Sequence, residues 1–250
     1  MAPRVEQSIN ESSRVLDGHD DPLQSWLFFE GDIRRPPTFR SHIEGDPSRV
    51  TVVMSWGGLW QNNEVPYKIN VSMDNSQRAM LAYSMRVFEN LTCVKFVPHD
   101  NQEDWIYITS DGETCSSDIG RIGGMQTVSL SDKCFKKGYP GIILHEFMHV
   151  LGFLHEHSRI NRDKHVHIHW KNIATGATEN FYKYKHPVVD EIDLPYDHGS
   201  VLHYGKHYFS KNEKATVTPK EGSFEIGQRT KLSKEDINKI NVVYKCNTRG

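Results

Sequence analysis

The sequence lacks the long apolar runs that a membrane span requires. No stretch approaches the roughly 18 apolar residues needed to cross a bilayer, because Gly, His or charged residues interrupt the longest runs. The opening MAPRVEQSIN also lacks the basic region followed by an apolar stretch that marks a signal peptide. We therefore expect no membrane span, and secretion has to be inferred from other features of the chain.

An excess of positive charge is also missing. The formal net charge is −2, with 30 Lys and Arg against 32 Asp and Glu, and no Lys- or Arg-rich block extends beyond a few residues. Nucleic acid binding needs a basic surface that neutralises phosphates, so we expect no nucleic acid partner. The 250 residues, 37% of them hydrophobic, are enough for one large domain or two small lobes around a substantial core.

The four cysteines form no C-x-x-C pair, which argues against a zinc ribbon held by cysteine. Two disulfides are the better interpretation. Four cysteines allow three connectivities, and spacing favours Cys115 with Cys134, which leaves Cys93 to join Cys246. N-glycosylation triplets also fit an extracellular chain, although such triplets arise by chance as well. They lie at Asn10, Asn70 and Asn90.

The first fifty residues differ from the rest. They are polar, contain the turn-prone stretches DGHDDP and RRPP, and hold one aromatic group at 26–29, which is typical of an extended leader. Beyond them, residue patterns predict strands at 65–71, 94–97, 105–109 and 127–130. Helices are predicted after the N-cap Asp74, at 142–151 before Gly152, and from the N-cap Ser233 to about residue 243. The chain after Arg159 shows little periodicity before this last helix.

The stretch HEFMH at 145–149 places two imidazoles four residues apart, on one face of a helix. With Zn–N distances of about 2.1 Å, His145 and His149 can hold one zinc ion, and Glu146 can reach a water on that ion without ligating it. Gly152 can end the helix and return His155 as a third ligand. The ion would lower the pKa of its water to about 7, and Glu146 would carry the water's proton to the leaving amine.

The alternative is that three histidines and a glutamate share a helix and a turn by chance, without binding a metal. A single His among 14 would prove nothing, but the complete spacing H-E-x-x-H-x-x-G-x-x-H is the signature of metzincin zinc proteases. Three further histidines, His165, His167 and His169, alternate along a candidate strand. We interpret them as one exposed strand face and not as a second metal site.

At these residues the chain resembles the astacin family of metalloendopeptidases, whose longer signature H-E-x-x-H-x-x-G-F-x-H-E-x-x-R is met by residues 145–159. The stretch SVLHYG at 200–205 resembles the family's Met-turn S-x-M-H-Y-G, which implies that Tyr204 is a fifth zinc ligand or a transition-state donor. One departure is Leu202 in place of methionine. In the family this methionine forms a hydrophobic floor beneath the zinc and does not ligate it. The resemblance therefore implies that leucine, of similar volume, should cost under about 1.5 kcal/mol, with activity retained.

The resemblance extends from about Leu59 to Cys246 and implies the same two disulfides that spacing favours. It further implies that Glu156 contacts the new N-terminus after the leader is cut, with an ordinary surface carboxylate as the alternative. Arg229 resembles the arginine of the S1′ pocket that favours acidic residues just after the scissile bond, with a solvated charge as the alternative.

The leader contains FEGD at 29–32, which resembles the family's pro-segment motif F-x-G-D. The resemblance implies that Asp32 takes the place of the water on zinc in a latent form. A trypsin-like protease would activate the chain by a cut near Arg49. Other arginines of the leader are alternative sites, namely Arg4, Arg14, Arg34, Arg35 and Arg40.

These observations predict an α+β, zincin-like (metzincin) domain of two lobes at 50–250, with the zinc helix at the floor of the cleft and an inhibitory pro-segment at 1–49. The expected function is a secreted endopeptidase with one zinc ion per chain, acting on protein or peptide substrates. The main rival is a catalytically silent zinc-binding or interaction module on the same scaffold, against which the presence of Glu146 argues. A third possibility is a structural secreted domain held together by disulfides.

Overall fold

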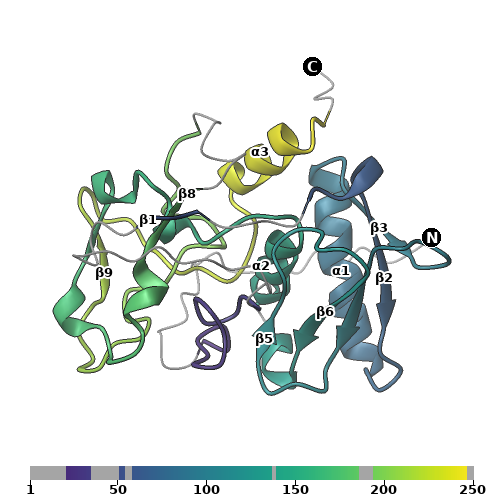
Figure 1. Ribbon diagram of the computed structural model, residues 1–250, viewed down its shortest axis with the longest axis horizontal. Coiled ribbons are helices and arrows are strands. Elements are labelled where there is room, and N and C mark those ends of the chain that lie inside the picture. The colour runs from purple at the N-terminus through teal and green to yellow at the C-terminus, as the bar shows by residue number, and fades with distance from the viewer. Residues whose placement is uncertain (1–20, 35–50, 54–57, 137–138, 186–193, 247–250) are drawn as a thin grey trace, which may run out of the picture.

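A computed structural model describes residues 21–34, 51–53, 58–136, 139–185 and 194–246. Figure 1 shows two lobes, one built on a sheet with helix α1 and the other on short strands and turns, with helix α2 between them. The leader segment 21–34 lies below α2, between the lobes. The predicted activation site at Arg49 lies outside the described residues, as do Arg4, Asn10, Arg14, Arg35 and Arg40.

The first lobe contains a five-stranded sheet in the order β3-β2-β4-β6-β5. All neighbours are parallel except β5, which runs antiparallel to β6. The strands are β2 Glu64–Ile69, β3 Lys95–Pro98, β4 Trp105–Thr109, β5 Cys115–Ser116 and β6 Met125–Leu130. Four of them match the strands predicted from sequence, whereas β5 was not predicted, because two residues are too short to show a pattern.

Helix α1, Asn75–Leu91, begins at the predicted N-cap. The Asp74 carboxylate accepts from the backbone of Ser76 and Gln77, and the Gln77 side chain returns a bond to the backbone of Asp74, which completes a capping box. Its buried face carries Phe88, which touches Phe96 of β3 and Phe147 of α2 with ring centroids 5.8 and 6.2 Å away. Burying each such ring stabilises the fold by about 1.5–3 kcal/mol, and this cluster joins α1, the sheet and α2.

All ten residues of helix α2, Gly141–Val150, are buried. A helix that is apolar around most of its circumference has to lie inside a protein, so α2 passes through the core of the molecule. Gly152, with φ +100°, ends this stretch in a Schellman motif: its N–H donates to the His149 carbonyl and that of Phe153 donates to the Met148 carbonyl. The predicted stop at Gly152 is therefore the observed one.

The second lobe is built from short pieces. Strand β7, Val166–Ile168, pairs antiparallel with β9, Val217–Pro219, and β1, Thr51–Val53, pairs parallel with β8, Lys183–Lys185. Helix α3, Lys234–Val243, begins at the predicted N-cap Ser233. In the described chain, two 3-10 helices adjoin the sheet of the first lobe, Gln61–Asn63 before β2 and Asp132–Phe135 after β6. Four more follow α2, namely Glu156–Ser158, Arg162–Lys164, Trp170–Asn172 and Thr178–Phe181. Pieces of three or four residues explain the missing periodicity after Arg159.

Two disulfides close the fold, Cys93–Cys246 and Cys115–Cys134, with Cα–Cα distances of 5.3 and 5.9 Å. This is the pairing that spacing favoured. The first closes a sequence separation of 153 residues and fixes the end of α3 beside the end of α1, and the second closes 19 residues. In the chain-entropy account, loops of these lengths are worth about 5 and about 3 kcal/mol.

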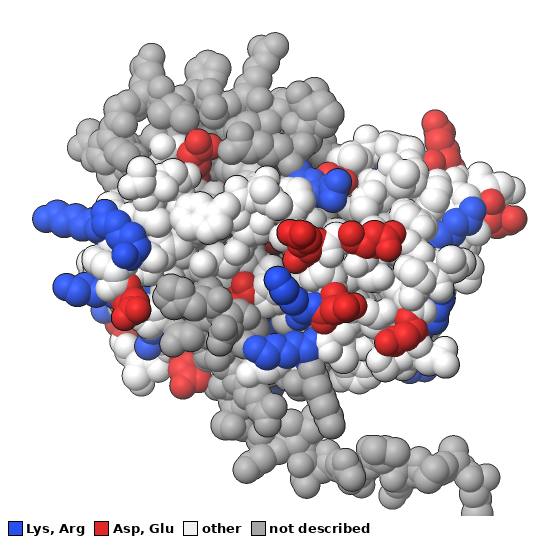
Figure 2. Space-filling view, turned by 90° about the horizontal axis from the view of Figure 1, so that it is seen from below, with Lys and Arg blue, Asp and Glu red and all other residues white. Residues whose placement is uncertain are grey.

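Within the described ranges, none of the helices has the length and apolar character needed to cross a bilayer. Figure 2 shows the molecule from below, where Lys and Arg side chains are interspersed with Asp and Glu around a broad uncharged area of the described surface. Interspersed charges of both signs do not build a strong potential of one sign over this part of the face.

Candidate metal centre

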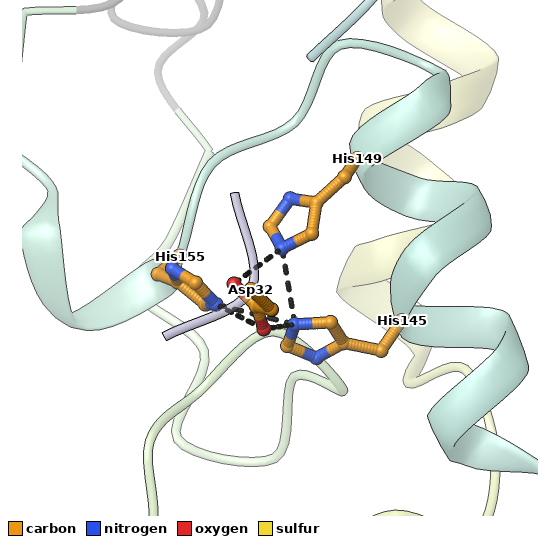
Figure 3. A group of neighbouring side chains, drawn as sticks. All are labelled: Asp32, His145, His149 and His155. Atoms are coloured by element: carbon orange, nitrogen blue, oxygen red, sulfur yellow. Dashed lines mark hydrogen bonds and ion pairs between the residues drawn. The ribbon is translucent and has the colours of Figure 1, made fainter. Parts of the chain in front are cut away.

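Three histidine side chains converge at one point beside α2. His145 and His149 come from successive turns of the helix, and His155 returns from the segment after Gly152 (Figure 3). The Nε2 atom of His145 lies 3.0 Å from that of His149 and 3.2 Å from that of His155. All three imidazoles are fully buried.

The hydrogen-bond partners of the Nδ1 atoms decide which nitrogen of each imidazole faces the common point. Nδ1 of His145 lies 2.7 Å from the Val201 carbonyl oxygen, and Nδ1 of His149 lies 2.7 Å from that of Phe153. A carbonyl oxygen only accepts, so each Nδ1 carries the proton and each Nε2 presents a lone pair to the common point. Two lone pairs 3.0 Å apart repel one another unless a proton or a cation lies between them. Hydrogen bonds from Nδ1 to carbonyl oxygens are typical of metal-ligating histidines.

The leader approaches the same point from the opposite side. Oδ2 of Asp32 lies 2.9 Å from Nε2 of His145 and 3.3 Å from that of His155, and Oδ1 lies 3.6 Å from Nε2 of His149. The four ligand atoms all lie within 4.8 Å of one another and could hold one metal ion. A tetrahedral zinc site with Zn–N of 2.0–2.1 Å separates its nitrogens by about 3.3 Å, so this donor set fits zinc.

Charge also favours a dication here. The leader brings a second buried carboxylate, Glu30, whose Oε2 lies 2.6 Å from Nδ1 of His155. Although burial lowers the pKa of His155, Asp32 and Glu30 outweigh that effect and raise it to about 9. Burial would raise the pKa of Asp32, but His155 and His145 hold it well below its usual value. One Zn²⁺ would neutralise the two leader carboxylates.

Glu146 lies between the two helical histidines with its carboxyl group fully buried. Among the described residues, neither of its side-chain oxygens has a hydrogen-bond partner. Burial, reinforced by the Asp32 carboxylate, raises the pKa of Glu146 well above its usual value. A buried carboxyl group without partners is destabilising, so its presence calls for a role other than packing.

The predicted tyrosine and the substituted Met-turn lie on the other wall of the site. The Tyr204 hydroxyl donates to the Glu30 carbonyl oxygen at 2.6 Å, and its ring stacks on His157 with centroids 3.6 Å apart. Leu202 is 1% exposed, and its carbonyl oxygen accepts from the Glu156 backbone at 3.2 Å. Its burial suits an apolar floor.

Glu156 is buried and already has partners for both carboxylate oxygens. Oε2 lies 2.5 Å from Nζ of Lys239 on α3, and Oε1 accepts from Arg159 and from the Asp197 backbone, both at 2.8 Å. Despite burial, Lys239 and Arg159 lower the pKa of Glu156 to about 2. The alternative of an ordinary surface carboxylate is therefore wrong, because Glu156 is buried. In this structure Lys239 pairs with one of the two oxygens that a new N-terminus could contact.

Arg229 is fully buried, so the alternative of a solvated charge is also wrong. Its guanidinium donates to three backbone carbonyls and to the Tyr208 hydroxyl, and it pairs with Asp21 of the leader. Sequence reasoning missed Asp21, Glu30, Tyr208 and Lys239. Glu30 had a signal, since it occupies the free position of F-x-G-D, whereas the other three meet their partners only through the tertiary fold.

The three alternating histidines lie apart from this centre, on and beside β7. The His165 ring stacks on Tyr196 with centroids 4.6 Å apart, and Nε2 of His169 lies 2.8 Å from Oγ1 of Thr218. His167 is exposed. The His165 ring also contacts that of His198, and the rings of His167 and His169 contact each other, both with centroids 6.3 Å apart.

The sequence model of the peptidase family Astacin matches residues 54–245. The chain belongs to the astacin family. Zinc metalloproteinase nas-14 of Caenorhabditis elegans is 41% identical over 254 residues, covering 93% of this chain and 50% of the relative. Zinc metalloproteinase nas-4 of the same organism is 42% identical over 260 residues, covering 98% and 81%. This astacin-family chain thus spans only half the length of nas-14.

Among solved structures, High choriolytic enzyme 1, a hatching enzyme zinc-protease from Oryzias latipes, superposes with a TM-score of 0.70. It shares 36% identity and covers 77% of this chain and 95% of its own. The α+β two-lobed fold expected of an astacin is therefore confirmed. The matched family region contains the three histidines, Glu146 and Tyr204, whereas Asp21, Glu30 and Asp32 lie upstream of it.

Proposed function

We propose that this chain is the latent precursor of a secreted zinc endopeptidase, with His145, His149 and His155 as zinc ligands. The observation that carries the proposal is the convergence of three Nε2 atoms beside a buried glutamate whose carboxyl oxygens have no hydrogen-bond partner among the described residues. A structural zinc site needs no such carboxylate. The silent-module alternative therefore leaves Glu146 without a role.

The chain's own residues divide the work of peptide hydrolysis. When bound, zinc supplies a Lewis acid that acidifies water and polarises a carbonyl group. Glu146 accepts the proton of the attacking water and delivers it to the leaving amine. The Tyr204 hydroxyl, which donates to the Glu30 carbonyl oxygen in the precursor, donates to the substrate's developing oxyanion once the leader has left.

The leader maintains latency by occupying two of these positions. Asp32 fills the metal centre, and the Glu30 carbonyl oxygen accepts the hydrogen bond of the Tyr204 hydroxyl. Next to them, the Arg34 N–H donates to the Ser117 carbonyl and the Ser117 N–H donates to that of Asp32, at 3.0 and 3.1 Å. The leader thus extends the edge of the sheet beside β5. Removal by a trypsin-like protease cutting near Arg49 would expose the centre.

Secretion is supported by the two disulfides, which persist in oxidising compartments. Asn90 is exposed at the end of α1 and is open to glycosylation, whereas the Asn70 amide already donates to Asp111 and Thr109. We therefore expect Asn90 to be the better acceptor of the two.

The test is hydrolysis of a quenched fluorescent peptide before and after limited trypsin treatment, with the trypsin then inhibited. We expect a rise that a zinc chelator abolishes and that Glu146→Ala lacks. A clean cut with one bound zinc and no hydrolysis would instead support the silent module. Zinc analysis showing no bound metal would favour the purely structural domain.

A further inference from the structure

The three histidines of the metal centre differ in what holds the Nδ1 atom, the ring nitrogen that points away from the common point. Nδ1 of His145 and Nδ1 of His149 each lie 2.7 Å from a backbone carbonyl oxygen outside the leader. Nδ1 of His155 lies 2.6 Å from Oε2 of Glu30, which belongs to the leader. Two of these partners therefore stay in place when the leader is cut away, and the partner of the third histidine leaves with it.

The backbone of Glu30 is fixed on the second lobe. Its N–H donates to Oδ1 of Asn180 at 3.0 Å, and its carbonyl oxygen accepts from the Tyr204 hydroxyl at 2.6 Å. The residue has φ +49°, a region that side chains other than glycine's rarely adopt. These contacts hold the leader backbone in an uncommon conformation that directs the carboxylate at His155.

The two leader carboxylates approach the His155 ring at different nitrogens. Oδ2 of Asp32 lies 3.3 Å from Nε2, on the side of the common point, whereas Glu30 lies at Nδ1. A carboxylate that accepts from the Nδ1–H of a ligand histidine fixes the tautomer and the orientation of the ring, and it makes the other nitrogen a stronger electron donor to a metal. Asp32 can therefore act on a metal directly, and Glu30 acts through His155.

Burial strengthens the contact between Glu30 and His155. Both side chains are fully buried, so solvent does not compete for the hydrogen bond. A hydrogen bond to an ionised acceptor is about twice as strong as one between neutral groups. Once the leader has left, water can replace the carboxylate, but as a neutral acceptor it polarises the imidazole less.

We propose that Glu30 is a positioning residue for zinc. By accepting the hydrogen bond of the Nδ1–H of His155, it makes the precursor bind zinc more tightly than Asp32 and the three histidines would without it. This inference rests on the proposed zinc centre. It gives the leader a second task beside latency, which is to hold the metal until activation.

The first arm of the test measures the zinc affinity of the full chain by competition with a chromophoric chelator. Glu30→Ala removes the acceptor and should weaken zinc binding about 10–100-fold, the usual effect of losing such a partner. Glu30→Gln keeps an acceptor oxygen without the charge and should lose less. After trypsin has removed the leader, all variants have the same sequence and should bind zinc equally, which checks that each has folded.

The second arm separates this role from docking of the leader. Trp26 belongs to the leader but not to the metal centre, and its ring packs edge-on against that of Phe209 with centroids 5.2 Å apart. Trp26→Ala is therefore the matched control, because it loosens the leader and leaves the carboxylate beside His155 unchanged. Hydrogen exchange of residues 21–34 measures the loosening in both variants. We expect Glu30→Ala to lose more zinc affinity than Trp26→Ala for the same rise in exchange.

The outcomes distinguish this inference from the proposed function. A wild-type precursor that binds no zinc would overturn the proposed function and this inference with it. A precursor that binds zinc equally well with Glu30→Ala would overturn the role of Glu30 alone. A loss of affinity that follows hydrogen exchange in the same proportion in Glu30→Ala and Trp26→Ala would assign the effect to docking, and this result would also overturn the role of Glu30.

Discussion

Replacing Gly31, a residue of the leader, by alanine should open the precursor. Gly31 has φ +89°, a region that favours glycine, and a Cβ there would lie 2.4 Å from the Leu23 carbonyl oxygen. Since that contact is to backbone, the loop has to shift, and the Glu30 and Asp32 side chains on either side shift with it. A strained backbone of this kind costs about 1–3 kcal/mol.

This strain destabilises the docked leader and shifts the equilibrium between the docked and the released leader towards release. A loss of about 2 kcal/mol raises the released fraction roughly 30-fold, so uncut Gly31→Ala should hydrolyse a quenched peptide roughly 30-fold faster than uncut wild type. Leu27→Ala is the control at an exposed leader position. After trypsin treatment all three proteins should reach equal rates. If Gly31→Ala stays as latent as wild type, the close approach of the leader to its own backbone does not maintain latency.

Three further changes probe the rest of the molecule. Tyr204→Phe should lower kcat of the activated enzyme about 100-fold with little change in KM, because an oxyanion donor is lost; an equal rate would remove that role. Burial raises the pKa of Asp118 from 3.8 to about 6 despite the nearby Arg34, so the folded chain binds its proton more tightly than the unfolded chain. The free energy of unfolding should therefore fall by up to about 3 kcal/mol as pH rises from about 4 to about 6, and urea unfolding of Asp118→Asn should lack this slope. Replacing Cys93 and Cys246 together by serine should lower the free energy of unfolding by about 2–5 kcal/mol, and an unchanged urea midpoint would contradict the stabilising role of this bond.

The helices and most sheet strands could be predicted because their signals are local. Asp74 and Ser233 cap α1 and α3 through bonds to residues two or three positions away, and Gly152 ends α2 by its own backbone conformation. Among the strands of the second lobe, only β7 was anticipated, from the alternating histidines at 165–169. The other three each have three residues, which is too few for alternation to be seen, and partners such as β7 and β9 lie far apart in the chain.

The residues of the metal centre could be predicted from the sequence to different extents. His145 and His149 follow from helical periodicity, whereas His155 depends on the turn after Gly152, which the family signature supplies. Asp21 contacts Tyr208, and Lys239 contacts Glu156, between segments more than 80 residues apart in the chain. No local sequence pattern predicts these contacts. Sequence reasoning also had no means to show that Glu156 is buried.

The ion pair between Lys239 and Glu156 connects α3 to the segment that carries His155. The far end of this helix is fastened to α1 by the Cys93–Cys246 disulfide, while Lys239, in its middle, neutralises the residue that follows His155. The C-terminal helix is thus attached at its end to the first lobe and at its middle to the segment that carries the third histidine.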